Sequence, residues 1–409
     1  SIAAGRLKQV QCRTELARHP RSPFARFLRL AFRARHSFIT AVHLVHLRLR
    51  DFRNYARLDI DFAPGFHLFL GGNAQGKTNL LEAIYFLATL RSFRGVSSAH
   101  LVRAGQKGYY LGATVLGQAE QSIRIYWSAN ERQLSLDGRP IRRLSEFLGV
   151  CRAVVFCTDD VQLVKGPASR RRRFLDLLLS QTHPTYLPLL QRYTRSLCSR
   201  NALLKERTQN EAALESFARE LIDLGSQIVQ LRRQLMPRFS PLATGAYQRM
   251  AGGADQLRLA YLPSVKEDFA VELSQSHARE RVLRATLVGP HRDDLQLLMD
   301  ERPAIHFASE GQKRSVAIAL KIAQAEYLAQ VHGTRPILLI DDIMGELDVR
   351  RRGAFLPLLQ KIQPAQGQVF MTCTEENWPA ELGGNLKRWE IRNGTVQAMA
   401  AGAQVSNLR

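Results

Sequence analysis

The alternation of apolar and polar residues predicts a β-rich region that begins at about residue 42. In residues 58–62, two aspartates separate three apolar side chains, as in a strand with one buried face. The apolar run 66–70 then enters a glycine-rich loop, and residues 79–88 after it have the composition of a helix. Further short apolar runs in residues 109–156, separated by polar turns, predict more strands.

The second half of the chain changes from helical to strand periodicity. Leucines and aromatic residues recur at helical spacing in residues 174–250, without the sustained heptads of a long coiled coil. Strands are predicted at 256–261 and 285–287, followed by an amphipathic helix at 313–330 and a buried strand at 336–342. This order predicts an α/β protein whose sheet core is interrupted by a short helical arm.

The loop after the run 66–70 fits the phosphate-binding pattern G-x-x-x-x-G-K-[ST]. Its glycines let several backbone N–H groups point into one cavity at a helix N-terminus, which suits phosphate oxygens. We therefore expect ATP here, with Lys77 at the β- and γ-phosphates and Thr78 as a magnesium ligand. A chance glycine-rich turn between a core strand and a core helix is the plain alternative. The expected contact residues are Gly71, Gly72, Asn73, Ala74, Gln75, Gly76, Lys77 and Thr78.

The buried strand 336–342 ends in two carboxylates, Asp341 and Asp342. A parallel strand delivers such acids to the edge of its sheet, where a P-loop ATPase holds its metal. Asp341 is therefore the expected partner of Thr78 in holding Mg²⁺. Asp342 is expected to orient or deprotonate the attacking water, so that it and Lys77 are the predicted catalytic residues.

A second turn of the phosphate-binding kind precedes the helix 313–330. Ser309, Gly311 and Gln312 open this helix and would present backbone N–H groups and a hydroxyl to an anion. A single active site needs only one phosphate-binding turn of this kind, whereas two copies of the protein that face each other would use both. The second turn therefore favours a homodimer.

The charge of the chain indicates a polyanionic partner. There are 58 Lys and Arg against 36 Asp and Glu, a net charge of +22 that favours nucleic acid first and an acidic membrane second. No uninterrupted apolar stretch is long enough to cross a bilayer, so we expect no membrane span. Five scattered cysteines without a C-x-x-C pair suit a reducing cytosol and suggest neither a disulfide framework nor a zinc site.

Residues 1–41 differ from the rest of the chain. They contain eight Arg and one Lys against a single acid, Glu15, a net charge of +8 that leaves +14 for the remainder. An organellar transit peptide, a disordered basic arm and translated upstream sequence are the alternatives. The late start of the globular pattern and the non-initiator Ser1 favour the last of these.

Three further polar groups have open interpretations. The basic loop 91–95 is either a solvated connector or a nucleotide or DNA contact. The four arginines 170–173 either form a solvated helix face or bind phosphates, and the positive net charge of the chain slightly favours phosphate binding. His291, Asp293 and Asp294 lie on a predicted loop and raise the hypothesis of metal-dependent nuclease activity.

Taken in order, these stretches resemble the RecF family, ATPases whose heads are similar to those of ABC transporters and SMC proteins. The resemblance extends from about residue 42 to the end, and it depends on the ordered set of motifs more than on any single one. The matching stretches are residues 47–55, the Walker A loop with Asn73, 91–95, 163–166 with the arginines after them, 289–294, the signature 309–312, the Walker B pair 341–342 and the D-loop 345–348.

The resemblance implies an ABC/SMC-type P-loop ATPase head with a mixed β-sheet core and an inserted short helical arm. The expected divisions are a basic leader at 1–41, a lobe with Walker A at 42–165, the arm at 166–255 and a lobe with signature, Walker B and D-loop at 256–409. The resemblance also implies that the signature of one subunit, with Asp348 of its D-loop, closes over ATP held by the other. ATP would then drive dimerisation, and slow hydrolysis would reverse it.

Membership of this family further implies a bacterial, cytoplasmic and nucleoid-associated protein of recombinational gap repair and replication restart. The dimer would clamp DNA at junctions between single-stranded and double-stranded segments, and the charge of +14 beyond the leader fits that use. With RecR and RecO it would assist RecA loading and support SOS induction. Its ATPase activity would be weak and DNA-dependent, used as a switch.

Four positions depart from the wider ABC pattern. Glu310 stands where ABC signatures carry glycine, although basic residues three and four positions later offset its charge. Asp342 replaces a longer glutamate, which fits slow hydrolysis. Gly345 replaces the D-loop serine, and Thr374 stands where transporters have a histidine switch. These departures leave ATP binding in place and predict inefficient turnover.

Three competing hypotheses explain fewer of these residues. An ABC-type ATPase subunit that powers a membrane or other partner complex is the main alternative, and the basic charge and Asp342 weigh against it. An SMC-type structural head would need a long coiled coil. A fused nuclease would need a second carboxylate cluster outside the nucleotide site.

Overall fold

The computed structural model describes residues 40–117, 119–206, 210–253, 255–362, 367–373 and 386–399. Its contacts divide the chain into two units, Ser1–Thr40 and Ala41–Arg409. The predicted leader lies outside the described residues except for strand β1 (Thr40–Ala41), and the position of the histidine switch, Thr374, also lies outside them.

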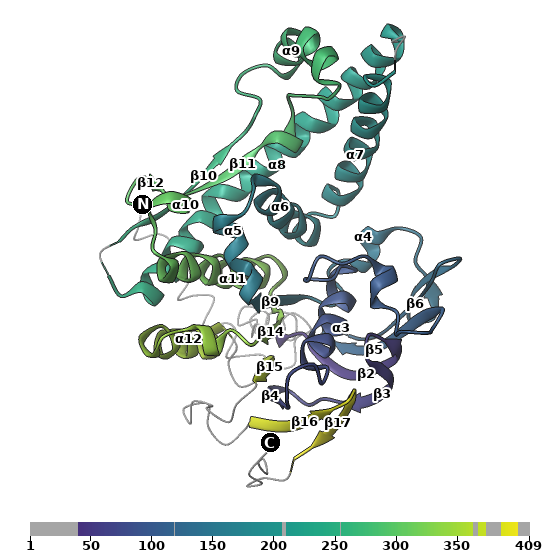
Figure 1. Cartoon of the computed structure of the whole chain (residues 1–409), viewed down its shortest axis with the longest axis vertical. Coiled ribbons are helices and arrows are strands. Elements are labelled where there is room, and N and C mark those ends of the chain that lie inside the picture. Colours follow the sequence, from purple (N-terminus) through teal and green to yellow (C-terminus); the bar gives the residue numbers. More distant parts are fainter. Residues whose placement is uncertain are drawn as a thin grey trace, which may run out of the picture. The chain divides into compact units, whose positions relative to one another are not determined.

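The first of two six-stranded sheets is mostly parallel (Figure 1). Neighbouring strands pair in parallel along the whole sheet except at one edge, where the last pair is antiparallel. The strands in spatial order are β9 (Ala153–Cys157), β14 (Ile337–Asp341), β15 (Gln368–Cys373), β4 (Gly65–Leu70), β16 (Leu386–Arg392) and β17 (Thr395–Ala398).

Both faces of this sheet are buried, as the continuous apolar runs of its strands predict. Leu68 and Leu70 of β4 pack into one hydrophobic core, whereas Phe69 between them packs into another. In β14, Leu338 and Leu339 divide between the two cores in the same way. The sheet therefore separates two cores, and polar residues gather at the ends of its strands.

An antiparallel sheet covers one of these cores, and helix α3 (Lys77–Thr89) lies between the two sheets (Figure 1). The alternation at 58–62 falls on strand β3, whose buried side chains face α3. The strands in spatial order are β3 (Tyr55–Asp61), β2 (His43–Phe52), β5 (Gly108–Leu116), β6 (Glu120–Ser128), β7 (Arg132–Leu136) and β8 (Arg139–Pro140).

Helices cover the other face of the parallel sheet. The central one is α11 (Glu310–His332), which is buried along most of its length. Around it lie α6 (Ala168–Thr182), α8 (Glu211–Ala251) and α12 (Val349–Ile362). The remaining short elements are η1 (Ser98–Leu101) and α4 (Leu144–Phe147), which pack in the core beneath the antiparallel sheet, and η2 (Thr158–Val161), α5 (Gln162–Lys165), β13 (Thr334–Arg335) and η4 (Met344–Glu346). The predicted α/β class is confirmed.

The helical arm is built on α8, a helix of 41 residues that continues through Pro237 and Pro241. Its C-terminal half packs on α11, where the rings of Phe239 and Tyr327 lie 6.2 Å apart. Its N-terminal half packs on α7 (Tyr186–Leu203) and α9 (Phe269–Leu283), away from the sheets (Figure 1). The arm boundaries at 166 and 255 stay a prediction, but the packing shows that α9, beyond 255, belongs with the arm helices.

A small antiparallel sheet lies beside α8. It contains β10 (Leu257–Leu262), β11 (Asp294–Met299) and β12 (Arg302–Pro303), and helices η3 (Pro290–Arg292) and α10 (Ala304–Phe307) flank it. The strand predicted at 256–261 is confirmed, whereas the strand predicted at 285–287 is wrong. The backbone N–H groups of Thr286 and Leu287 donate to the side chains of Asn201 and Glu280 instead of to a neighbouring strand.

A buried ion-pair network joins the arm to the loop 289–294. Arg232 of α8 is 2% exposed, and its guanidinium donates to Asp293 at 2.8 Å and to Asp176 at 2.7 Å. Asp293 also accepts hydrogen bonds from the Ser264 backbone N–H, at 2.8 Å, and from the Tyr261 hydroxyl. The buried charges are therefore both paired and hydrogen-bonded, as burial requires.

We expect the stability of the fold to decrease as the pH falls from 6.5 towards 4. Burial lowers the pKa of His67 and of His291 from 6.5 to about 4. The unfolded chain therefore takes up protons in this range that the folded chain does not, which costs about 2 kcal/mol for each histidine between pH 7 and pH 5. Urea unfolding at the two pH values measures the loss. A His67→Gln variant should lose less than the wild type, and equal losses in both proteins would contradict the assignment.

Candidate nucleotide-binding site

The glycine-rich loop 71–76 connects β4 to α3, as the sequence pattern predicts. Gly76 has φ 117°, a left-handed value that side chains other than glycine rarely adopt. A Cβ atom there would lie 2.6 Å from the Asn54 side chain, and a Cβ at Gly71 would meet the carbonyl oxygen of Ile391. The loop thus depends on glycine at both ends, and its N–H groups lead into the N-terminus of α3.

The Lys77 side chain folds back over this loop. Its ammonium donates to the carbonyl oxygens of Gly71, at 2.5 Å, and Gly72, at 2.8 Å. Burial lowers the pKa of Lys77, and the carboxylate of Asp342 opposes that shift. The ammonium therefore lies where P-loop proteins bind nucleotide phosphates.

Thr78 and the Walker B carboxylate meet across the sheet edge. The Thr78 hydroxyl donates to Asp341 Oδ1 at 2.9 Å, and the Thr372 hydroxyl of β15 donates to the same oxygen at 2.9 Å. Burial raises the pKa of Asp341, and these two hydrogen bonds oppose the rise. A hydroxyl and a carboxylate in contact form the hard oxygen ligand pair that Mg²⁺ uses in such sites. The predicted pair is therefore together, although its residues are 263 positions apart.

Asp342 has a left-handed backbone conformation, with φ 53°. Its N–H donates to the Thr372 hydroxyl at 3.1 Å, which fixes the turn that follows β14. Strain of this kind is uncommon outside glycine and is often found at functional sites. Its role as the residue that orients water stays a prediction.

Residues of the turn 51–55 hold the glycine-rich loop in place through hydrogen bonds. The Asn54 amide donates to the Gln75 carbonyl at 2.9 Å and accepts from the Asn79 amide at 2.8 Å. The Tyr55 hydroxyl donates to the Gly76 carbonyl at 2.9 Å. The strand pattern predicts a turn at 51–55 between two strands, and β2 and β3 confirm it, but periodicity gives no sign of its contact with the loop.

The basic loop 91–95 is anchored by a buried carboxylate. Glu82 of α3 is fully buried and pairs with Arg53 through two hydrogen bonds of 2.8 and 2.9 Å, and it also accepts from the Ser92 hydroxyl. Arg94 donates to the Asn79 side chain at 3.2 Å. This part of the loop is therefore fixed by contacts within the fold, whereas Arg91 lines a cleft.

The signature turn 309–312 forms a capping box at the N-terminus of α11. The Ser309 hydroxyl accepts from the Gln312 N–H at 3.2 Å, and the Gln312 side chain accepts from the Ser309 N–H at 2.7 Å. The Gln312 amide also donates to Asp255 at 2.6 Å. This reciprocal cap satisfies the N–H groups of Ser309 and Gln312, so an anion contact predicted for this turn would use those of Glu310 and Gly311.

The D-loop contacts the signature through Arg351. The Arg351 guanidinium packs so closely on Gly311 that a Cβ there would lie 2.5–2.6 Å from it. It also donates to the Ser315 hydroxyl at 3.0 Å and to Asp348, which accepts the Arg351 backbone N–H at 2.8 Å as well. These hydrogen bonds lower the pKa of Asp348. A Cβ at Gly345 would meet no atom within 4 Å, so the missing D-loop serine leaves open space.

The unusual Glu310 is neutralised within the chain. It pairs with Lys165 of α5 and with Lys313, at 3.4 Å, and these partners lower its pKa. The predicted offset by Lys313 is confirmed. Arg314 does not take part in this offset, because it pairs with the Glu346 carboxylate at 3.0 Å. The stretch 163–166 therefore contacts the signature turn through the ion pair between Lys165 and Glu310.

Within one chain, the Walker A loop and the signature turn have separate partners. The Walker A loop bonds Asn54, Tyr55 and the Walker B aspartate, whereas the signature turn bonds Asp255 and Lys165. Among the described residues, no hydrogen bond or ion pair joins the loop 71–78 to the turn 309–312. The structure brings together Lys77, Thr78, Asp341 and Asp342, and it groups Asp348 with the signature.

The loop 289–294 is a structural junction. The His291 ring lies 2.7 Å from the Tyr193 hydroxyl, and Asp294 pairs with Arg171 through bonds of 2.7 and 2.9 Å. Arg172 donates to the Asp293 carbonyl at 2.7 Å. In the described part of the chain, no group of three or more His, Cys, Asp or Glu could hold a metal ion. The nuclease hypothesis gains no support. Three of the four arginines 170–173 have partners within the chain, because Arg170 also donates to Asp159 at 3.2 Å.

Fold and site together define a P-loop ATPase head of the ABC/SMC type. A family model described as the RecF/RecN/SMC N terminal domain matches residues 43–395. The DNA replication and repair protein RecF of Symbiobacterium thermophilum is 38% identical over 376 residues, covering 87% of this chain and 98% of that protein. That of Lactobacillus gasseri is 35% identical over 375 residues, covering 87% and 99%. The chain belongs to the RecF family.

Solved structures agree with this assignment. The recombination mediator protein RecF with ATP, of the RecFOR pathway, has a TM-score of 0.81 and 30% identity, covering 89% of this chain and 100% of that one. The SMC head domain of Pyrococcus furiosus has a TM-score of 0.53 and 18% identity over 88% and 96%, which shows the fold alone. The predicted ABC/SMC-type head is confirmed. Among the described residues, no helix has the length and apolarity to cross a membrane.

Proposed function

We propose that this chain is an ATP-dependent switch that pairs with a second copy of itself and holds DNA at single-strand/double-strand junctions. The observation that carries the proposal is the separation of two complete phosphate-binding turns within one chain, each with its own supporting contacts. Two copies that face each other use all four turns. ATP then acts as a ligand of the paired state, and hydrolysis releases the pair.

The residues at the loop 71–78 fit ATP with Mg²⁺. Lys77 would neutralise the β- and γ-phosphates, and Thr78 with Asp341 would hold the metal, which screens phosphate charge during transfer. Asp342 would orient the attacking water. Ser309, Gly311 and Gln312 of the second copy would contact the γ-phosphate, with Asp348 nearby. Because Asp342 is short and the D-loop lacks its serine, we expect a weak, DNA-dependent ATPase.

The cellular role follows from the relatives and from the charge. A solved relative is a recombination mediator of the RecFOR pathway, and its ATP-bound form shares the fold of this chain. The net charge of +14 beyond residue 41 suits sequence-neutral contact with DNA phosphates. We therefore assign this chain to bacterial recombinational gap repair and replication restart in the cytoplasm at the nucleoid. RecR and RecO are the proposed partners, RecA loading is the outcome, and SOS induction follows from it.

The test is sedimentation of the wild type with ATP and Mg²⁺, with ADP and Mg²⁺, and without nucleotide, each with and without a gapped DNA duplex. We expect dimers with ATP alone and tighter DNA binding in that state. Lys77→Met removes the ammonium at the phosphates, so the variant should stay monomeric in all conditions. A wild type that stays monomeric in ATP, or DNA binding that ignores nucleotide, would overturn the proposal.

A further inference from the structure

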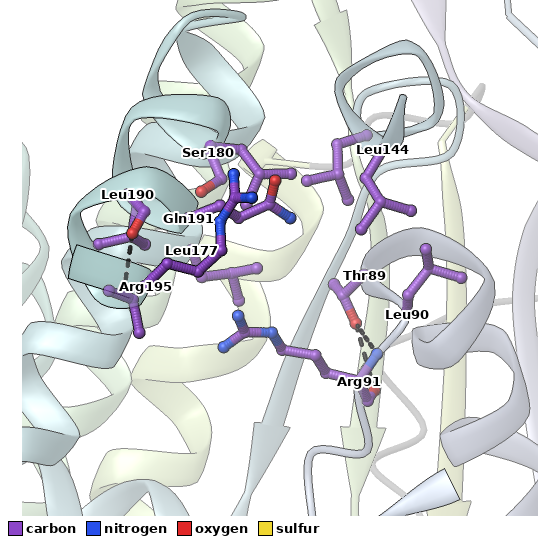
Figure 2. Close-up of a pocket in the computed structure, with 12 residues that line it drawn as sticks. Thr89, Leu90, Arg91, Leu144, Leu177, Ser180, Leu190, Gln191 and Arg195 are labelled. Carbon is purple, nitrogen blue, oxygen red and sulfur yellow. Dashed lines mark hydrogen bonds between the residues drawn. The ribbon is translucent and has the colours of Figure 1, made fainter. Parts of the chain in front are cut away.

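A cleft of about 650 Å³ lies between the ATPase sheets and the arm (Figure 2). It is distinct from the nucleotide site, since its lining comes from the C-terminal end of α3, from α4, and from α6 and α7. Figure 2 shows Arg91 extending from its loop toward Leu177, with Leu144 on the far wall. The volume is in the range that binds a small ligand or several side chains of a partner.

One wall of the cleft is a continuous face of α7. The lining positions follow helical spacing of i, i+3, i+4, i+7 and i+8, so they form a single stripe along the helix. The stripe changes from apolar to polar to basic along its length. Its members are Leu187, Leu190, Gln191, Thr194 and Arg195.

The opposite wall and the floor are also rich in leucine. Leu90 and Leu144 face the stripe, and Leu177 and Ser180 of α6 form the floor. The Leu144 side chain is 40% exposed at the edge of the cleft. A partner that fills the cleft covers the exposed part of Leu144 and the partly exposed Leu90, Leu177 and Leu190, which favours an apolar side chain there.

The charges of the cleft have one sign. Arg91 and Arg195 lie among the twelve lining residues, and none of the twelve is acidic. A smaller hollow of about 110 Å³ shares Arg91 but has mixed charge, since Asp159 and Asp160 line it together with Arg170, Arg173 and Lys321. None of the twelve is aromatic either, so the cleft offers no ring on which a nucleic-acid base would stack.

We propose that this cleft binds an acidic, leucine- or phenylalanine-bearing segment of a partner protein. The apolar side chains of that segment fill the space between α4 and the start of the α7 stripe. Its carboxylates pair with Arg91 and Arg195, in the way that grooves take amphipathic helices. This site is independent of the ATP-dependent pairing proposed above.

The probe is a displayed library of random twelve-residue peptides, panned on the full chain. We expect enriched peptides to combine Asp or Glu with Leu or Phe, and Arg195→Glu to weaken a selected peptide at least tenfold. The same peptide with lysines in place of its acids should bind Arg195→Glu better than it binds the wild type. Arg233→Glu changes an exposed arginine outside the cleft and should leave peptide binding unchanged.

Two results would overturn the inference. One is enrichment of no peptide, or of peptides without this composition. The other is binding that Arg195→Glu and Arg233→Glu weaken equally, or a cleft variant that loses affinity for gapped DNA instead of for peptide. Dimerisation in ATP should be unchanged in Arg195→Glu, so that failure here is distinguishable from failure of the pairing proposal.

Discussion

Arg232→Met is expected to lower the free energy of unfolding by about 3–5 kcal/mol, because it leaves buried carboxylates without their cation. Asp293 is 1% exposed, and the Arg232 guanidinium is its ion-pair partner at 2.8 Å. Asp176 loses its own bond to the same guanidinium, at 2.7 Å. Urea unfolding at pH 7 measures the change. The loss should be largest for the arm, since α8 supplies the arginine and the loop 289–294 the carboxylate.

Arg192→Met is the matched control, since Arg192 pairs with Glu220 at 3.1 Å with both side chains largely in solvent. Exposed pairs contribute about 0–1 kcal/mol, so this variant should unfold almost as the wild type does. If Arg232→Met does not fold, Tyr261→Phe removes one donor to Asp293 and should cost about 1–3 kcal/mol. Equal losses for Arg192→Met and the Asp293 partners would show that the buried network adds nothing.

The local motifs of this protein are predictable from sequence because the residues of each lie close together in the chain. A glycine-rich loop between an apolar run and a helix defines the Walker A turn, and a continuous apolar run that ends in two acids defines the Walker B strand. Both stand in the structure where the pattern places them, at β4 with α3 and at β14. The sheet order joins them, because β15 pairs with both strands.

The contacts between motifs could not be predicted from the sequence, because the two residues of each contact are far apart in the chain. Arg171 and Asp294 are 123 positions apart, and charge alone suggested phosphates for one and metal chemistry for the other. Asp293 and Arg232 are 61 positions apart. Each charge is explained by its partner, which no periodicity reveals. The 285–287 segment misleads because two side chains replace a strand partner, one distant in sequence (Asn201) and one close (Glu280).

The proposed trans arrangement of the signature predicts that ATPase activity returns when two inactive variants are mixed. Each variant should be inactive by itself: Lys77→Met because it stays monomeric, and Ser309→Arg because every site that it forms with its own copy has an altered signature turn. In a mixed dimer, one site carries both defects and the other carries none. An equal mixture should therefore recover roughly a quarter to a half of the wild-type rate, as two-fold symmetry dictates. Loss of the Ser309 cap costs only about 1 kcal/mol, so the variant should stay folded.

A mixture of Lys77→Met with Asp342→Asn is the matched control. Both residues serve the nucleotide held by their own chain, since Lys77 lies on the Walker A loop and Asp342 follows the Walker B strand beside it. Every site in that mixed dimer then carries a defect, and no activity should return. Recovery in the Ser309 mixture alone requires the signature to act across the dimer. If neither mixture recovers ATPase activity, or if both do, the turn 309–312 is only the N-terminal cap of α11.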